Sequence, residues 1–487
     1  MSLVGLDVGT TGVKAIRISE TGEVMARHEE EYPLSIPQPG WAEQDPEDWW
    51  RATERALDAV GHDGPIGLTG QMHGLVLLDS GDRILRPAIL WNDQRTGAEC
   101  AEIEELVGFE RLVALTGNRA LPGFTAPKLV WVRKHEPEVW SRVAHVLLPK
   151  DYVRLRLTGE RAIDAAEASG TLLFDVAGRR WSDEVCKTLE IPLEWLPDAH
   201  ESTAIGGAGD QQAGALGVGV VGPGPTSNTV LQAPQSGPAG RSGASNTVLQ
   251  GQLLSVVLGT SGVVFAPLAG FRADPEARVH VFCHAVPDTW EAMGVMLSAA
   301  GSLRWLRDVV GGTYDELIAE AAAWPPGSEG LTFLPYLQGE RTPHADPAAR
   351  AMFEGLSLRH DRGALVRSVL EGVAYGLRDS LELLRELGVE PSAGRASGGG
   401  ARSELWLRIV ASVLGIPIER TAVEEGAAYG AALLGGVAAG TFATAQEAVD
   451  ACVRVRDTVE PEPEWQRVYD EGYERFRSLY PAIKGVA

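Results

Sequence analysis

Residues 3–12 read LVGLDVGTTG, and residues 253–262 read LLSVVLGTSG. Each stretch is an apolar, strand-like run that ends in two glycines flanking two hydroxyl residues. Such glycines let successive backbone N–H groups converge, and the Thr and Ser hydroxyls add further donors, an arrangement that suits phosphate. The repeated pattern predicts two related domains that hold one polyphosphate from both sides.

Length and composition limit the class of protein. The chain has 487 residues, too many for one core, and its 44% hydrophobic and 22% charged residues are typical of a globular protein. Strand-like and helix-like stretches alternate, which favours the α/β class. The net charge of −23 argues against nucleic acid or an anionic membrane as a partner. The absence of a long apolar run and of a secretory signal, together with four scattered cysteines, predicts a cytoplasmic protein with reduced thiols.

Several helices and strands can be placed from local pattern. A helix is expected from Asp45 to about Val60, because Asp45 can cap it and Pro46 suits its first turn. Apolar periodicity and end signals predict further helices and two strands. The helices are expected at about 97–106, 364–387, 403–414 and 463–480, and the strands at 66–69 and 75–78.

Two acids and one lysine are candidates for phosphoryl chemistry. Asp7 ends the first strand and can hold Mg²⁺ through water beside the phosphates, although Asp-x-Gly is also an ordinary turn. Lys14 either reaches a phosphate or is merely solvated. Asp210 lies in the small-residue stretch GAGDQQAG and can accept a proton from a substrate hydroxyl, or can simply cap a helix.

Other polar segments leave alternatives open. His73 in QMHG can bond a polar ligand or be structural, and WNDQR at 91–95 is either a sugar or domain contact or an exposed helix start capped by Asn92 or Asp93. The glycines of SGGGARS at 397–403 let a ring or a phosphate approach the backbone. GERTPH at 339–344 is undecided between structure and site, and the small-faced helix at 424–432 is explained by packing alone.

The order of these segments resembles the FGGY family of carbohydrate kinases over nearly the whole chain. The matching segments include WAEQDPEDWW (41–50), GQMHG (70–74), PAILWNDQR (87–95), PGFTAPKLVWV (122–132), LPKDY (148–152) and LPYLQGERTPH (334–344). The resemblance implies an actin/hexokinase-like (ribonuclease H-like) fold in which two α/β domains face a deep interdomain cleft. It implies a sugar-binding N-terminal domain at 1–205, an ATP-binding C-terminal domain at 206–455 and a C-terminal helical segment at 456–487.

The resemblance also implies an activity and residue roles. It implies phosphorylation of D-xylulose with MgATP to D-xylulose 5-phosphate, and a homodimer is the family expectation. Asp210 would be the base and Asp7 would assist Mg²⁺. The sugar pocket would contain Met72, His73, Trp91, Asn92 and Asp210. ATP would contact Thr10, Thr11, Lys14, Gly259, Thr260, Ser261, Gly399, Gly400 and Arg402.

One region departs from the family pattern. Roughly twenty residues are absent before Asp210, judged by the lengths expected of such a unit, and a stretch rich in Gly, Ser, Pro and Gln follows at 222–252. The loss is expected to remove a strand from the second domain's sheet and to leave Asp210 poorly anchored. Either the extra stretch, which contains SNTVLQ twice, fills the strand place, or the region is altered and activity is impaired. The alternative functions are another FGGY pentulose or polyol kinase and, because of the altered region before Asp210, a non-catalytic sugar-binding relative. The composition of 222–252 predicts a flexible surface loop.

Overall fold

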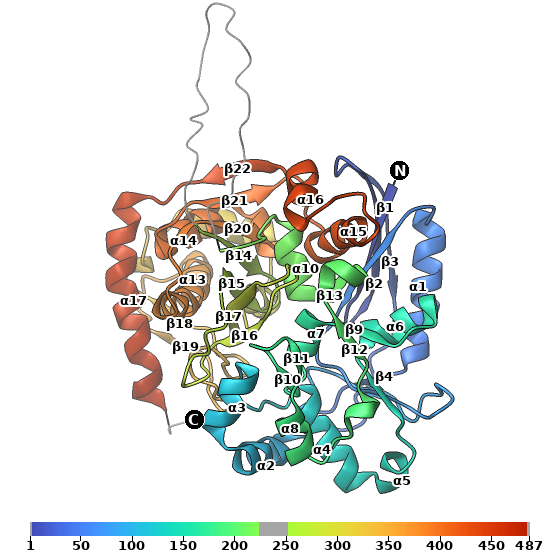
Figure 1. Ribbon diagram of the computed structural model, residues 1–487. Coiled ribbons are helices and arrows are strands. Elements are labelled where there is room, and N and C mark those ends of the chain that lie inside the picture. Colours follow the sequence, from blue (N-terminus) through green and yellow to red (C-terminus); the bar gives the residue numbers. More distant parts are fainter. Residues whose placement is uncertain (1, 224–251, 485–487) are drawn as a thin grey trace, which may run out of the picture.

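Two twisted sheets lie side by side in the computed structural model, which describes residues 2–223 and 252–484 (Figure 1). The first sheet has the order β13-β5-β1-β2-β3 and the second the order β16-β17-β15-β14-β20-β21-β22. The strands of the first are β1 Ser2–Val8, β2 Gly12–Ser19, β3 Val24–Glu31, β5 Ile66–Gly70 and β13 Gly207–Gly209. Those of the second are β14 Gln252–Leu258, β15 Gly262–Leu268, β16 His280–Cys283, β17 Trp290–Met296, β20 Pro391–Ser397, β21 Ile418–Thr421 and β22 Val455–Val459.

The two sheets follow one plan. In each, an antiparallel hairpin (β1–β2, β14–β15) continues into a third antiparallel strand (β3, β17), and a parallel strand (β5, β20) pairs with the other side of the first. The turns of these hairpins are the two glycine-rich loops. The predicted pair of related α/β domains is therefore confirmed.

Helices cover both sheets, and short strand pairs join the elements between them. The helices are α1 Pro46–Val60, α2 Gly97–Val107, α3 Phe109–Thr116, α4 Thr125–His135, α5 Pro137–Trp140, α6 Pro149–Thr158, α7 Ala165–Ser169, α8 Asp183–Thr188, α9 Ser202–Ile205, α10 Asp210–Gly217, α11 Ala300–Val310, α12 Tyr314–Ala322, α13 Arg362–Glu386, α14 Glu404–Leu414, α15 Gly426–Ala438, α16 Ala445–Cys452 and α17 Pro463–Ile483. The short pairs are β4 Glu43–Gln44 with β7 Ala88–Ile89, β6 Val76–Leu78 with β8 His145–Leu147, β9 Ala162–Asp164 with β12 Asp198–His200, β10 Phe174–Asp175 with β11 Arg180–Trp181, and β18 Thr332–Leu334 with β19 Met352–Glu354.

Helix α15 joins the far end of the chain to the first sheet. It packs on β1, β5 and α10, and small residues let the backbones approach closely. A Cβ added to Gly5 would lie 1.9 Å from Ala428 O, and one added to Gly67 would lie 1.7 Å from Ala431 O. The small-faced helix is thus explained by packing, as the sequence indicates.

Most of the expected elements are present. Helix α1 begins after Asp45, whose side chain accepts a hydrogen bond from Glu47 N, and the other four helices and both strands lie where they are predicted, within a few residues. The segment 91–95 is not an exposed helix start. Helix α2 begins only after its N-cap Thr96, so neither Asn92 nor Asp93 caps it. Asp93 is fully buried and pairs with Arg95 at 2.7 Å.

The region before Asp210 corrects an expectation. The prediction of a poorly anchored Asp210 is wrong, because α9, a left-handed turn at Gly206 and the three residues of β13 lead directly to it. β13 pairs in parallel with β5 at the edge of the first sheet, so that sheet continues beyond residue 205. The three residues of β13 are enough to extend the sheet, because a strand at the edge has to pair with only one neighbouring strand. The expected gap in the second sheet is absent too, since β14 pairs with described strands on both sides.

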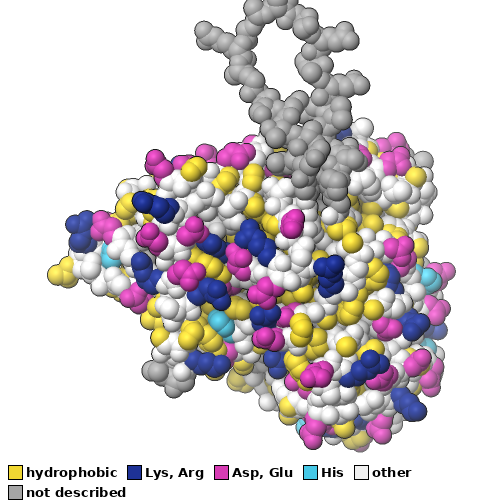
Figure 2. Space-filling model, turned by 60° about the vertical axis from the view of Figure 1, so that its left-hand side comes forward, with side chains coloured by type: hydrophobic (Ala, Val, Ile, Leu, Met, Phe, Trp, Pro, Cys, Tyr) yellow, Lys and Arg dark blue, Asp and Glu magenta, His cyan; other side chains and the backbone are white. Residues whose placement is uncertain are grey.

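The two SNTVLQ repeats, and with them the predicted replacement strand and flexible loop, lie outside the described residues. Within residues 2–223 and 252–484, no helix is both long and apolar enough to cross a membrane. On the face in Figure 2, basic side chains are interspersed with acidic ones and form no large patch of one sign.

Candidate active site

The loop between β1 and β2 is held by side chains from distant segments. Gly9 N donates to Gly12 O at 3.0 Å and closes the turn. The Gly9 carbonyl accepts from Gln71 Nε2 at 3.2 Å and from the Tyr32 hydroxyl, and the Thr10 carbonyl accepts from Gln44 Nε2 at 2.7 Å. The Gly9 and Thr10 carbonyls are thus engaged by hydrogen bonds from protein side chains. Thr11 lies on the exposed side of the turn.

Two carboxylates stand beside this loop. Asp7 ends β1 opposite Lys14, and burial raises its pKa to about 6. Asp210 begins α10 at the end of β13, and its side chain does not cap the helix, whose N-cap is Gly209. Burial and the negative charge of Asp7 raise the pKa of Asp210 to about 7. A base with this pKa near neutrality is well matched to taking a hydroxyl proton.

The carboxylates of Asp7 and Asp210 could also bind a hard cation. Asp7 accepts no hydrogen bond from a described residue, so its oxygens are free, and the repulsion between two neighbouring carboxylates falls when a cation lies next to them. The described residues contain no cluster of three or more His, Cys, Asp or Glu side chains placed to hold a metal. In proteins Mg²⁺ is usually held by one or two carboxylates together with substrate phosphates, so Asp7 and Asp210 could hold it only together with such phosphates.

Met72 lies against Gly209, the residue before Asp210, and His73 follows Met72 in the chain. His73 has a left-handed backbone (φ 68), its carbonyl accepts from Lys128 Nζ at 2.9 Å, and its Nδ1 lies 2.6 Å from Gly170 O. A Cβ on Gly170 would come within 2.7 Å of the ring. Burial lowers the pKa of His73 to about 3, so the imidazole is a neutral hydrogen-bonding group. Met72 is buried, and a Cβ on Gly209 would lie 2.7 Å from its sulfur.

Trp91 is hydrogen-bonded to the first glycine-rich loop. Its Nε1 donates to Thr10 Oγ1 at 2.9 Å, and Thr10 Oγ1 donates to Gln71 Oε1 at 3.3 Å. The Thr10 hydroxyl is therefore part of a network within the first domain. Asn92 Oδ1, in contrast, is buried without a hydrogen-bond partner among the described residues, and it is available to a polar ligand.

Among the described residues, backbone groups hold the loop between β14 and β15. Gly259 O accepts from Ala300 N at 2.8 Å, and Thr260 O accepts from Ala299 N at 2.8 Å and from Gly301 N at 3.2 Å. These donors lie at the start of α11. Thr260 is exposed at the tip of the turn and Ser261 is half-buried beside it.

The glycine turn after β20 lies against this second loop. β14 and β20 pair in parallel, and a Cβ on Gly398 would lie 2.7 Å from the Leu258 backbone. A Cβ on Gly399 would point into open space, whereas one on Gly400 would lie 2.9 Å from the Leu258 side chain and 3.0 Å from Trp406. Gly400 is thus needed for packing, and Gly399 leaves room for a ligand.

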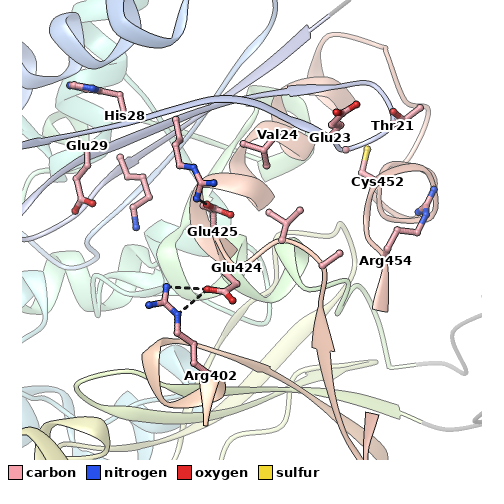
Figure 3. A pocket seen from close by; sticks show the side chains of 15 residues that line it. Thr21, Glu23, Val24, His28, Glu29, Arg402, Glu424, Glu425, Cys452 and Arg454 are labelled. Atoms are coloured by element: carbon pink, nitrogen blue, oxygen red, sulfur yellow. Dashed lines mark hydrogen bonds and ion pairs between the residues drawn. The ribbon is translucent and has the colours of Figure 1, made fainter. Parts of the chain in front are cut away.

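Lys14 and Arg402 line one open cavity of about 1070 Å³ between the two halves of the molecule. Arg402 and Glu424 form an ion pair at 3.0 Å, and Figure 3 shows this pair beside Glu425. Arg27 of β3 pairs with Glu425 at 2.7 Å and so connects the two halves. Two of the residues predicted to bind ATP are therefore brought to one cleft from opposite sides.

The predicted residues thus fall into two groups. One contains Asp7, Thr10, Thr11, Met72, His73, Trp91, Asn92 and Asp210, and the other contains Gly259, Thr260, Ser261, Gly399, Gly400 and Arg402, with Lys14 facing Arg402. Sequence reasoning did not assign roles to Gln44, Gln71 and Tyr32, which hold the first loop. Gln44 and Gln71 lie inside the WAEQD and GQMHG segments, whereas nothing local marks Tyr32.

Comparison with known proteins agrees with this geometry. Residues 2–225 match the N-terminal domain of the FGGY family of carbohydrate kinases, and residues 254–439 match its C-terminal domain. The xylulose kinase of Escherichia coli K12 is 42% identical over 508 aligned residues, with 99% of both chains covered. The gluconokinase of Bacillus subtilis is 29% identical over 90% of this chain and 88% of its own.

Solved structures agree as well. The structure titled as a xyloylose kinase from Brucella ovis superposes with a TM-score of 0.89 at 39% identity, with 100% of both chains covered. The xylulose kinase from Rhodospirillum rubrum gives a TM-score of 0.85 at 31% identity over 99% of both chains. With two matching domains, an actin-like pair of α/β units and full-length similarity to xylulose kinases, the chain belongs to the FGGY family of carbohydrate kinases.

Proposed function

We propose that this protein transfers the γ-phosphoryl group of MgATP to D-xylulose and forms D-xylulose 5-phosphate. The observation that carries the proposal is the position of Asp210. This carboxylate, with a pKa of about 7, follows Gly209, which packs against Met72, and it lies near enough to Asp7 for the charge of Asp7 to raise that pKa. The xylulose kinases among the relatives supply the choice of sugar.

The chemistry assigns a task to each group. His73 and Asn92 bind sugar oxygens, and Asp210 accepts the proton of the attacking hydroxyl. Donors of the two loops, with Thr11, Thr260 and Ser261, bind phosphate oxygens, and Lys14 adds positive charge. Mg²⁺ beside Asp7 would neutralise charge on the phosphates. The adenosine is placed by the open side of Gly399 and by Arg402. Closure of the cleft excludes water, which competes with the sugar as phosphoryl acceptor.

A coupled ADP assay tests the proposal with D-xylulose, D-ribulose, D-gluconate and no sugar, each with Mg²⁺. We expect the highest kcat/KM for D-xylulose and little ADP without sugar. A preference for D-ribulose or D-gluconate would assign the protein to another sugar. Thermal stabilisation by sugar without ADP formation would make it a sugar binder, and rapid ADP release without sugar would reveal a cleft open to water.

A homodimer and a cytoplasmic location stay predictions. All four cysteines are free and buried, as expected of reduced thiols. Sedimentation of the purified protein measures its oligomeric state.

A further inference from the structure

Helix α10 is attached to the second sheet at both of its ends, although its first residue, Asp210, follows the edge strand of the first sheet. Near its start, Gln212 Nε2 donates a hydrogen bond to Glu291 Oε1 of β17 at 2.7 Å. At its end, the carbonyl of Val218 accepts a hydrogen bond from Arg395 Nη1 of β20 at 2.8 Å. The helix that begins with the proposed base therefore connects the two halves of the molecule.

The contact near the start of the helix also reaches the backbone before the base. A Cβ added to Gly209 would collide with Gln212 Oε1, so the Gln212 amide lies directly against the residue that precedes Asp210. Gln212 and Glu291 are both fully buried. The amide is thus held between the Gly209 backbone on one side and β17 on the other.

Glu291 has no cation to balance a negative charge. It forms no ion pair with any described residue, and the nearby Arg179 is engaged by Glu201 through hydrogen bonds of 2.8 and 2.6 Å. Of the titratable groups beside it, burial raises the pKa of the Cys283 thiol to about 12 and lowers that of His284 to about 3, so both are neutral. An unpaired buried carboxylate is costly, and burial accordingly raises the pKa of Glu291 well above its usual range.

Two oxygens at this contact have no hydrogen-bond partner among the described residues. They are Gln212 Oε1 and Glu291 Oε2, one from each side chain, and both are buried. With an ionised Glu291 both oxygens are acceptors and cannot bind each other. A proton on Glu291 Oε2 makes it a donor, and a carboxylic acid and an amide can then form two hydrogen bonds side by side. Such pairing avoids the cost of leaving buried polar groups unsatisfied.

We propose that Glu291 is protonated at Oε2 and donates a hydrogen bond from there to Gln212 Oε1, so that the two side chains form a neutral pair joined by two hydrogen bonds. Gln212 and Glu291 are then positioning residues, which hold the start of α10, and with it Asp210, against the second sheet. This inference deepens the proposed function, and its positioning part rests on that function.

The test compares two substitutions of Glu291. Glu291→Gln keeps the shape and supplies an N–H donor in place of the O–H, but it does not titrate. Glu291→Leu removes both hydrogen bonds. The matched control is Glu276→Gln, the same substitution at an exposed acid before β16. The measurements are kcat, KM for sugar and for ATP, sugar Kd by calorimetry, and the melting temperature from pH 5 to 9.

The kinetic arm tests the positioning of Asp210. For Glu291→Leu we expect kcat to fall about 10- to 100-fold, because catalysis is sensitive to small displacements of the reacting groups. Sugar Kd and KM for ATP should change less than about twofold, and Glu291→Gln should keep kcat within about threefold of wild type. If Glu291→Leu does not fold, Gln212→Met takes its place. A kcat within about twofold of wild type in a folded Glu291→Leu or Gln212→Met variant overturns the positioning role, and Glu291→Gln as slow as Glu291→Leu contradicts the neutral pair.

The melting temperatures test the proton on Glu291. A carboxyl whose pKa is raised by folding stabilises the protein fully at low pH, and this contribution is lost as the pH rises towards the folded-state pKa. The melting temperature of wild type should therefore fall relative to that of Glu291→Gln between pH 5 and 9, by about 1–3 °C per pH unit. Glu276→Gln should follow wild type. A difference between wild type and Glu291→Gln that stays constant over this range would show an ionised Glu291 and overturn the proposal.

The two proposals fail in different ways. If wild type prefers D-gluconate or D-ribulose, the choice of D-xylulose fails, and the Glu291 variants are assayed with the preferred sugar. If wild type phosphorylates D-xylulose and Glu291→Leu keeps its kcat, only the positioning role fails. If wild type phosphorylates none of the sugars, the proposed function and the positioning role fail together, and the melting temperatures still decide whether Glu291 carries its proton.

Discussion

The two glycine-rich loops occupy the same place in two sheets of one plan, yet they carry different side chains. By sequence position, Asp7 and Lys14 of the first hairpin correspond to Val257 and Val264 of the second. The first loop is held by the side chains of Gln44, Gln71 and Tyr32, and the second by backbone N–H groups at the start of α11. The strands around the first loop therefore carry a carboxylate and an ammonium group, whereas the matching positions around the second loop are uncharged. Their local sequences nevertheless look alike.

The largest expected effect comes from removing Asp210, the proposed base beside the first loop. Asp210→Asn keeps the shape and removes the proton acceptor, so kcat should fall by about 10²–10⁴. Steady-state ADP formation measures this loss, and calorimetry should find sugar and ATP still bound. Asp58→Asn, an exposed acid on α1, is the matched control and should be unchanged. Turnover near that of wild type in Asp210→Asn would remove Asp210 from its role.

The next effect comes from making the first loop resemble the second. Asp7→Val replaces the acid by valine, the residue at the matching position Val257 of the second loop. We expect kcat to fall by about 10²–10³, because charge on the phosphates is then less well neutralised. The dependence on Mg²⁺ concentration should move to higher values. Val257→Ala is the companion variant and should change kcat less than about threefold. Equal losses in the two variants would show that the loops share the chemistry evenly.

A smaller effect tests how the first loop is held. Gln71→Leu removes the hydrogen bonds from Nε2 to Gly9 O and to Gln44, and it leaves buried polar groups without partners. KM for ATP should rise about tenfold with kcat less affected, as measured by initial rates over a range of ATP concentrations. Gln94→Leu, an exposed glutamine, is the control. An unchanged KM would mean that the loop keeps its shape without these side chains.

The smallest effect concerns pH. As the proposed base, Asp210 can take a proton only when it is deprotonated, so kcat/KM for the sugar should fall as the pH drops through its pKa of about 7. The charge of Asp7 raises that pKa, and Asp7→Asn removes the charge, so the acid limb should move to lower pH by less than about one unit. Rates from pH 5 to 9 in wild type and Asp7→Asn measure the shift. A limb that moves to higher pH would contradict the pairing of the two acids.

Local sequence pattern was sufficient to predict the two glycine-rich loops and most helices, because helix caps, glycines and apolar periodicity act over a few residues. It was not sufficient for Gln44, Gln71 and Tyr32, which reach the first loop from segments separated from it in sequence. It also failed before Asp210, where a full-length strand was assumed although the edge of the first sheet accepts the three residues of β13.

Helix α15 has a consequence for biosynthesis. It covers the face of the first sheet that contains Leu3, Ile16 and Ile18, with Ala428 and Leu433 in the same cluster. A ribosome releases β1, β2, β3 and β5 early and α15 near the end. The nascent first half therefore emerges with one apolar sheet face bare, a surface of the kind that chaperones bind. A fragment that ends before Gly426 would keep that face exposed permanently and should aggregate.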